Sequence, residues 1–214
     1  MYIIITCILV ILLFCCLLNR LKLDQQFYEQ KEIYPELGEL QDNWEVVRKE
    51  AMDAQNGWKD WPEDLVNKEG RWTVFPLLGF GKWVPENCEK CPETTRMLRK
   101  INGLRTAGFS RLGKNTKLRF HRGWASLSNH VLRCHLPLIV PKKGKCGIAV
   151  DNKFQQHVAG KWMVFDDSKV HSGINETDEE RIILLVDLER PFCVAKGTSP
   201  SEDTSELKQF VAAM

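Results

Sequence analysis

The stretch VLRCHLPLIV (residues 131–140) is one of several short apolar runs between residues 104 and 188. KCGIAV (145–150), KWMVFDD (161–167) and RIILLVDL (181–188) follow it, and turn residues such as those at 141–144 separate them. Two earlier runs have the same character, LRTAGFSRL (104–112) and TKLRFH (116–121). Several short strands with regular turn signals predict an all-β sandwich or barrel.

Polar residues interrupt these runs at three places. His121 ends one run and His171 follows another, and two imidazoles that converge from different strands suit iron or zinc. Arg133 and His135 alternate with apolar neighbours. Residues i and i+2 of a strand share a face, so both point the same way. Arg181 opens a strongly apolar run, where an inward-facing arginine needs an anion such as a carboxylate.

Each of these residues also has a simpler interpretation. A lone histidine is more often structural than a metal ligand, and an arginine at a strand edge more often pairs with a surface carboxylate. Together, the histidine pair and the arginines predict a metal site with a dicarboxylate cosubstrate. The other two histidines, His130 and His157, lie in polar, turn-like surroundings, and we expect both at the surface.

Composition excludes some classes of protein. The chain of 214 residues is 43% hydrophobic and 27% charged, which predicts a packed core. The net charge of +2 and the lack of a Lys/Arg-rich run argue against nucleic-acid binding.

Cys88 and Cys91 form a CxxC motif, but no second CxxC follows to complete a zinc ribbon. We interpret it as a loop before a helix capped near Thr94 or Thr95. The sequence does not decide whether the two cysteines form a local disulfide.

The N-terminal residues 2–18, YIIITCILVILLFCCLL, carry no charge and are long enough for a short membrane span. No basic segment precedes them and no small-x-small cleavage site follows, which favours an uncleaved anchor over a signal peptide. Arg20 and Lys22 follow the span, and by the positive-inside rule they weakly favour a cytosolic C-terminal domain. Residues 21–69 are expected to be a stalk and a helical approach.

Four segments carry a resemblance to a known family: FSRLGKNTKLRFHRG (109–123), LRCHLPLIVP (132–141), FDDSKVH (165–171) and RIILLVDLERP (181–191). They resemble the aspartyl/asparaginyl β-hydroxylase domain of the Fe(II)/2-oxoglutarate dioxygenases. The spacing from Ser110 to His121, the RxH at 133–135 and the spacing from His171 to Arg181 are the specific part. A weaker resemblance extends upstream to residue 70.

The resemblance implies a mainly β fold, a double-stranded β-helix (jelly roll, cupin-like), with flanking N-terminal helices. It implies that His121 and His171 bind iron, and that Fe(II), 2-oxoglutarate and O2 take part in the reaction. The implied cosubstrate residues are Arg181 with Ser110 at the distal carboxylate, Arg133 and His135 at the other end, and, less securely, Trp72. The domain would cover residues 70–195, between the anchor (1–20) with its stalk and a peripheral C-terminal tail (196–214).

Two departures from related oxygenases bear on activity. Many carry His-x-Asp, but Gly123 stands where this carboxylate would be, and the family resembled here also lacks it. The site is then either active with two imidazole ligands, as the intact arginines and Ser110 favour, or dead. The segment WASLSNHV (124–131) is a few residues longer than usual and puts substrate preference in doubt. Asp166 and Asp167 are structural candidates or neighbours of a ligand histidine.

Three functions stay open at this stage. The first is hydroxylation of the β-carbon of Asp or Asn side chains in a protein substrate, such as an EGF-like domain. The second is the same chemistry on a lipid acyl chain or another substrate, and the third is an inactive interaction module. The positive-inside rule weakly favours a cytosolic domain, but the resemblance favours an endoplasmic reticulum membrane protein with a lumenal catalytic domain. The sequence does not predict an oligomeric state.

Overall fold

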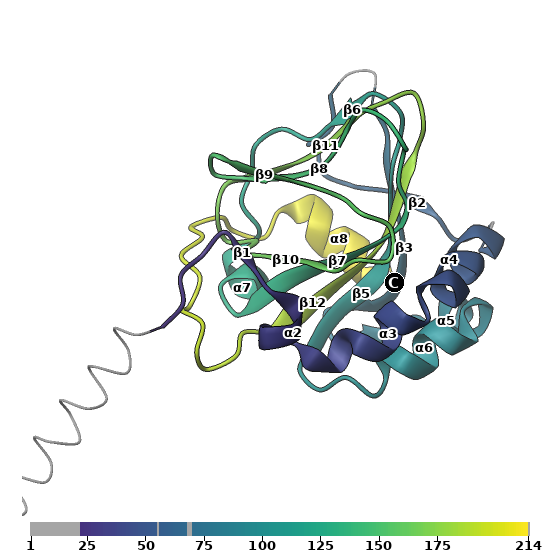
Figure 1. Ribbon diagram of the computed structural model, residues 1–214, viewed down its shortest axis with the longest axis horizontal. Helices are drawn as coiled ribbons and strands as arrows, with labels where there is room; N and C mark the ends of the chain where they lie inside the picture. Colours follow the sequence, from purple (N-terminus) through teal and green to yellow (C-terminus); the bar gives the residue numbers. More distant parts are fainter. Residues whose placement is uncertain (1–21, 55, 68–69, 214) are drawn as a thin grey trace, which may run out of the picture.

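The computed structural model describes residues 22–54, 56–67 and 70–213, which are mainly antiparallel β-structure (Figure 1). The larger sheet has the strand order β1-β10-β7-β12-β5-β3-β2, with β4 paired to β3, and the smaller sheet has the order β6-β11-β8-β9. The strands of the larger sheet are β1 (Phe27–Tyr28), β2 (Lys59–Asp60), β3 (Trp72–Gly79), β4 (Lys82–Trp83), β5 (Leu104–Leu112), β7 (Val131–Ile139), β10 (Met163–Phe165) and β12 (Arg181–Glu189). Those of the smaller sheet are β6 (Thr116–Lys117), β8 (Lys145–Val150), β9 (Lys153–Gln156) and β11 (His171–Glu176).

The larger sheet carries different chemistry on its two faces. Leu132, Cys134 and Leu136 of β7 are buried in the main hydrophobic core, whereas Arg133 and His135 line a cavity between the two sheets. Strand β12 continues this division, because Leu185 lies opposite His135 and Asp187 opposite Arg133. Side chains of directly paired residues share a face, so the polar residues of neighbouring strands gather inside the barrel.

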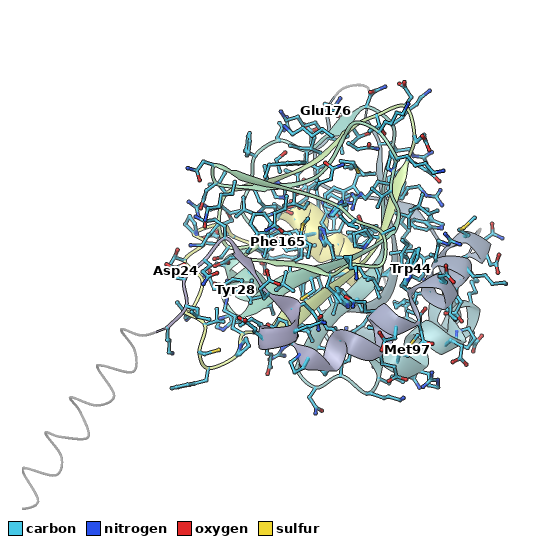
Figure 2. The ribbon with its side chains drawn as sticks, in the orientation of Figure 1. Asp24, Tyr28, Trp44, Met97, Phe165 and Glu176 are labelled. Atoms are coloured by element: carbon cyan, nitrogen blue, oxygen red, sulfur yellow. The ribbon has the colours of Figure 1, made fainter. Side chains whose placement is uncertain are left out.

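Helices cover the outer face of the larger sheet, opposite the smaller sheet (Figure 1). Figure 2 shows Trp44 and Met97 among these helices and Phe165 in the interior of the barrel. Residues 27–54, which we expected to be a stalk and approach, therefore pack onto the domain, and Leu37, Leu40 and Val47 are fully or almost fully buried. The helices are α2 (Gln30–Ile33), η1 (Pro35–Leu37), α3 (Gly38–Asp42), α4 (Trp44–Asp53), α5 (Pro85–Lys90) and α6 (Pro92–Leu98).

The CxxC segment differs from the expected loop. Cys88 lies in α5 and Cys91 precedes α6, which begins at Pro92 rather than at Thr94 or Thr95. The carboxylate of Glu50, from α4, accepts hydrogen bonds from the first amides of α6, so a side chain from another helix caps it. In the part of the chain that the structure describes, both cysteines are free and buried.

The C-terminal segment is not peripheral. Helix α8 (Ser205–Ala212) begins after Thr204, whose hydroxyl accepts a hydrogen bond from the amide of Leu207. Leu207 is only 3% exposed. Together with the short helix α7 (Ala125–Ser128), α8 lies at one end of the barrel (Figure 1).

The apolar run at residues 2–18, which the sequence predicts to be a membrane anchor, lies outside the described residues. Among the helices of the described ranges, none has both the length and the apolar character that crossing a bilayer requires.

Candidate active site

All seven residues that the sequence singled out line one cavity between the two sheets. His121 and His171 come from the smaller sheet and its edge, and the other five come from β3, β5, β7 and β12 of the larger sheet. Because strand register places each of them, residues that are far apart in the chain meet in this cavity. The five are Trp72, Ser110, Arg133, His135 and Arg181.

The histidine pair is held by backbone pairing. His121 and His171 form an isolated antiparallel bridge, with N···O distances of 3.0 and 2.8 Å, and their ring centroids are 4.2 Å apart. Each ring contacts the carbonyl oxygen two residues earlier through Nδ1, at 2.8 Å for Arg119 and 3.0 Å for Lys169. A carbonyl only accepts hydrogen bonds, so each Nδ1 must carry the proton. Each Nε2 therefore has a free lone pair, as a metal ligand requires.

Burial favours the neutral form of both rings. It lowers the pKa of His121 and of His171 to about 4, from the ordinary value near 6.5. Both imidazoles are therefore uncharged at neutral pH, which is the state that binds a metal ion.

A buried carboxylate lies beside this pair. Asp167 Oδ1 is 3.2 Å from His171 Nε2 and 2.6 Å from Arg133 Nη1. The remaining donors of Arg133 bind both oxygens of Asp187, at 2.8 and 3.0 Å. Arg133 was predicted to contact a cosubstrate, and that role stays a prediction. In this structure the guanidinium holds Asp167 against the histidine.

The contact between Asp167 and His171 requires a positive partner. Carboxylate oxygen and deprotonated Nε2 are both acceptors, so a proton or a cation must accompany them at this distance. Burial raises the pKa of Asp167 to about 6, although the attraction of Arg133 acts in the opposite direction. A proton shared by Asp167 and His171 can therefore supply the positive charge when no metal is bound. The same arrangement fits a metal ion next to Nε2.

Gly123 has a steric reason to be glycine. A Cβ atom there would lie 1.9 Å from Asp167 Oδ2. The carboxylate of Asp167 thus fills the space into which an aspartate at 123 would project. The sequence showed the missing carboxylate, but not that the side chain of Asp167, from the segment before β11, fills the same space. The one sequence feature that indicates this arrangement is the position of Asp167, four residues before His171.

We predict that Gly123→Ala pushes Asp167 away from His171 and lowers the free energy of unfolding by about 1–3 kcal/mol, as overpacking of a rigid interior does. Denaturant titration measures the change. Gly38→Ala is the matched control, because Gly38 is helical and a Cβ there meets nothing within 4 Å. Equal effects of the two substitutions would contradict the packing argument.

The same cavity holds a charge that has no partner among the described residues. Arg181 is 3% exposed, and its Nε and Nη1 donate to no group in the described part of the chain. Burial lowers its pKa to about 10, so it is still charged at neutral pH. Ser110 Oγ lies in the same cavity and accepts a hydrogen bond of 3.0 Å from Trp72 Nε1. A buried, unpaired guanidinium fits an incoming carboxylate.

His157 is not a surface residue, contrary to our expectation. It is 3% exposed, and its Nε2 lies 3.3 Å from Nδ1 of His135. The turn-like sequence around His157 does not reveal that β9 carries this residue back into the barrel. There the backbone amide of His157 donates a hydrogen bond to the carbonyl oxygen of Cys146. His135 Nε2 and His157 Nδ1 are buried without partners among the described residues. His130 is exposed, as expected.

We predict that stability falls as the pH is lowered. His121, His135, His157 and His171 all have a pKa below the ordinary value, because loss of contact with water disfavours the charged imidazolium. The unfolded chain therefore binds more protons below about pH 6.5, and this stability, complete above that pH, is lost toward about pH 4. Asp167, whose folded pKa is raised, opposes this between about pH 6 and 4, but it is one group against four.

Urea titrations at about pH 7 and about pH 5 measure the effect. His157→Gln should flatten the pH dependence, because it removes one buried imidazole, and the matched control His130→Gln should leave it unchanged. Higher stability at the lower pH would contradict the prediction.

The jelly roll places a histidine pair and a buried arginine in one cavity. Residues 41–191 match the family described as Aspartyl/Asparaginyl beta-hydroxylase, and this chain belongs to that family. The recognised resemblance and the jelly-roll fold are thereby confirmed.

Individual proteins agree with this assignment. An ornithine lipid ester-linked acyl 2-hydroxylase of Rhizobium tropici is 41% identical over 128 residues, which is 59% of this chain and 44% of that protein. Human aspartyl/asparaginyl beta-hydroxylase is 30% identical over 182 residues, 81% of this chain and 24% of that protein. The chain thus spans less than half the length of these curated relatives. A 2OG-Fe(II) oxygenase family structure from Burkholderia pseudomallei shares the fold, with a TM-score of 0.50 and 14% identity, over 72% of this chain and 82% of that one.

Proposed function

We propose that this chain is an Fe(II)- and 2-oxoglutarate-dependent hydroxylase, with iron on His121 and His171 and the cosubstrate on Arg181 and Ser110. One observation carries the proposal: a buried arginine without a partner in the described residues shares a cavity with two imidazoles whose Nδ1 atoms contact backbone carbonyls, so that Nε2 is the atom left to bind a metal. No group of three or more His, Cys, Asp or Glu residues in the described ranges is arranged to hold a metal. The proposed site accordingly has two protein ligands.

When bound, the iron, 2-oxoglutarate and O2 supply an oxidation that yields succinate, CO2 and one hydroxyl group on the substrate. The chain's own residues position and shield this chemistry. The backbone bridge orients both imidazoles, Arg181 neutralises one carboxylate, and His135 is available to donate to the other. Phe165 packs edge-on against His135 and tilted against His171, which keeps water from that wall.

Succinate release by the purified chain, supplied with Fe(II), 2-oxoglutarate and O2, tests the proposal. The expected result is succinate that depends on all three components and on His171, together with a substrate mass gain of one oxygen atom. A chain that binds 2-oxoglutarate but releases no succinate with any substrate class would support an inactive module instead.

Two substrate classes have specific support. The family and the human relative are named for β-hydroxylation of aspartyl and asparaginyl groups, which favours the β-carbon of Asp or Asn side chains. An EGF-like domain is the first protein substrate that we propose. The Rhizobium relative, named for hydroxylation of a lipid acyl chain, favours a lipid. Parallel assays with peptides and with lipid vesicles, read by mass spectrometry, separate the two.

We also propose that residues 2–18 anchor the protein in the endoplasmic reticulum membrane, with the catalytic domain in the lumen. The uncharged apolar run supports the anchor, and the family resemblance supports the lumenal side. Resistance to alkaline extraction, and glycosylation of an acceptor site added to the C-terminus, are the expected results. A protease-sensitive, unglycosylated C-terminus in intact microsomes would reverse the orientation.

A further inference from the structure

A second buried histidine pair, His135 and His157, adjoins the candidate active site. His135 lines the cavity together with His121, His171 and Arg181, whereas His157 does not line it. The Nε2 atom of His157 lies 3.3 Å from Nδ1 of His135, and the two residues are only 3% and 4% exposed. Any influence of His157 on a molecule in the cavity therefore acts through the ring of His135.

The contact between these two rings has room for one hydrogen. Burial holds the pKa of both imidazoles well below the ordinary value, so each ring is neutral at neutral pH and carries one N–H. Phe165 packs edge-on against His135, with 5.0 Å between the ring centroids, and thereby fixes the plane of this ring. Either His157 donates through Nε2–H to His135, or His135 donates through Nδ1–H to His157.

The two arrangements offer opposite chemistry to the cavity. When His157 donates, the proton of His135 lies on Nε2, which becomes a hydrogen-bond donor. When His135 donates, its Nε2 carries only a lone pair. This Nε2 atom has no partner among the described residues, and neither do Nε and Nη1 of Arg181 in the same cavity. Because a carboxylate only accepts hydrogen bonds, the first arrangement alone lets His135 act beside Arg181 in binding one.

Backbone hydrogen bonds hold His157 in place on both sides. Its amide donates to the carbonyl oxygen of Cys146 in β8 at 2.9 Å. Three residues further on, the amide of Gly160 donates to the carbonyl oxygen of Pro137 in β7, also at 2.9 Å. The segment after β9 is thus tied to two strands, and it presents the ring of His157 to His135 in one position.

We propose that His157 is a positioning residue that fixes the tautomer of His135. The Nε2–H of His157 donates to Nδ1 of His135, and the Nε2–H of His135 is then directed at a carboxylate in the cavity. The identification of that carboxylate as part of 2-oxoglutarate rests on the function proposed above. The proton position on His135 is a property of the protein and can be measured without turnover.

Nitrogen NMR of the full chain in detergent micelles, with 15N in the histidine rings, tests the tautomer. Protonated and unprotonated imidazole nitrogens have well-separated shifts, and the loss of one ring in His135→Gln assigns the signals of His135. We expect its proton on Nε2, both without iron and after addition of 2-oxoglutarate. A proton on Nδ1 of His135 in the presence of 2-oxoglutarate would overturn the proposal.

Two substitutions of His157 separate positioning from packing. Calorimetric titration with 2-oxoglutarate, with Mn²⁺ in place of iron to prevent turnover, measures both. His157→Leu removes the donor and should raise the dissociation constant roughly tenfold, with the proton of His135 spread over both nitrogens. His157→Gln should restore most of the affinity and the Nε2 proton, because its amide can donate from a similar place.

The matched control is His130→Leu, which should keep the affinity because His130 is exposed. Equal losses in the Leu and Gln variants of His157, with an unchanged proton position on His135, would mean that His157 only fills space and would overturn the proposal. If His157→Leu does not fold, the spectrum of the unmodified protein and the Gln variant still decide.

The same measurements distinguish this proposal from the proposed hydroxylase. A proton on Nε2 of His135 that moves in His157→Leu, in a chain that does not bind 2-oxoglutarate, would refute the cosubstrate and support the positioning role. Unchanged 2-oxoglutarate affinity and succinate release in His157→Leu would refute the positioning role and leave the hydroxylase standing.

Discussion

Replacing His121 by alanine is expected to abolish iron-dependent conversion of 2-oxoglutarate, with a loss of more than about 100-fold. Loss of residues that merely orient a ligand already costs 10- to 100-fold, and here only two imidazoles are available. The visible charge-transfer absorption of the anaerobic iron–cosubstrate complex should disappear together with succinate release. The fold should survive, because His121 is partly exposed and its backbone bridge does not need the ring.

His130→Ala is the matched control for this loss. His130 is exposed and does not line the cavity, so the variant should keep both the absorption and the activity. Activity like that of the unmodified protein in His121→Ala would remove the iron assignment.

Replacing Arg181 by methionine is expected to change binding and stability in opposite directions. Loss of charge-assisted hydrogen bonds worth about 1.5–3 kcal/mol should raise the dissociation constant of 2-oxoglutarate roughly 10- to 150-fold. The free protein should become more stable, because a buried guanidinium whose Nε and Nη1 lack partners in the described chain is replaced by an apolar side chain.

Calorimetric titration and thermal unfolding without cosubstrate measure the two effects. Arg111→Met is the matched control, because Arg111 lies on the neighbouring strand β5, pairs with Glu180 and stacks on Trp58 away from the cavity. That variant should keep the affinity. An unchanged affinity in Arg181→Met would reject the carboxylate role, and a loss of stability would mean that the guanidinium already has a partner.

Strand periodicity predicted the inner face of the barrel well. The alternation of Arg133 and His135 with apolar neighbours placed both in the cavity, because side-chain direction in a strand is a local property. The family resemblance added Ser110 and Trp72 from other strands, and these line the same cavity. Their roles toward iron and cosubstrate stay predictions.

Features that depend on non-local packing were missed. Nothing near His157 in the sequence indicates that β9 pairs with β8 and carries the ring to His135. The relation of Asp167 to Gly123 likewise depends on how two distant segments approach each other. The polar composition of the C-terminal tail concealed Leu207 and Phe210, whose environment becomes apolar only after the barrel has formed.

The bridge between His121 and His171 has a consequence for the order of folding. Strands β7, β8, β9 and β10 all lie between the two histidines in the chain, so a long loop must close before the rings can meet. Contacts of such high contact order form slowly. A nascent chain released before β11 would contain His121, Arg133 and His135 but no histidine pair. Occupancy of this pair by a metal would thus report that the last strands of the barrel have docked.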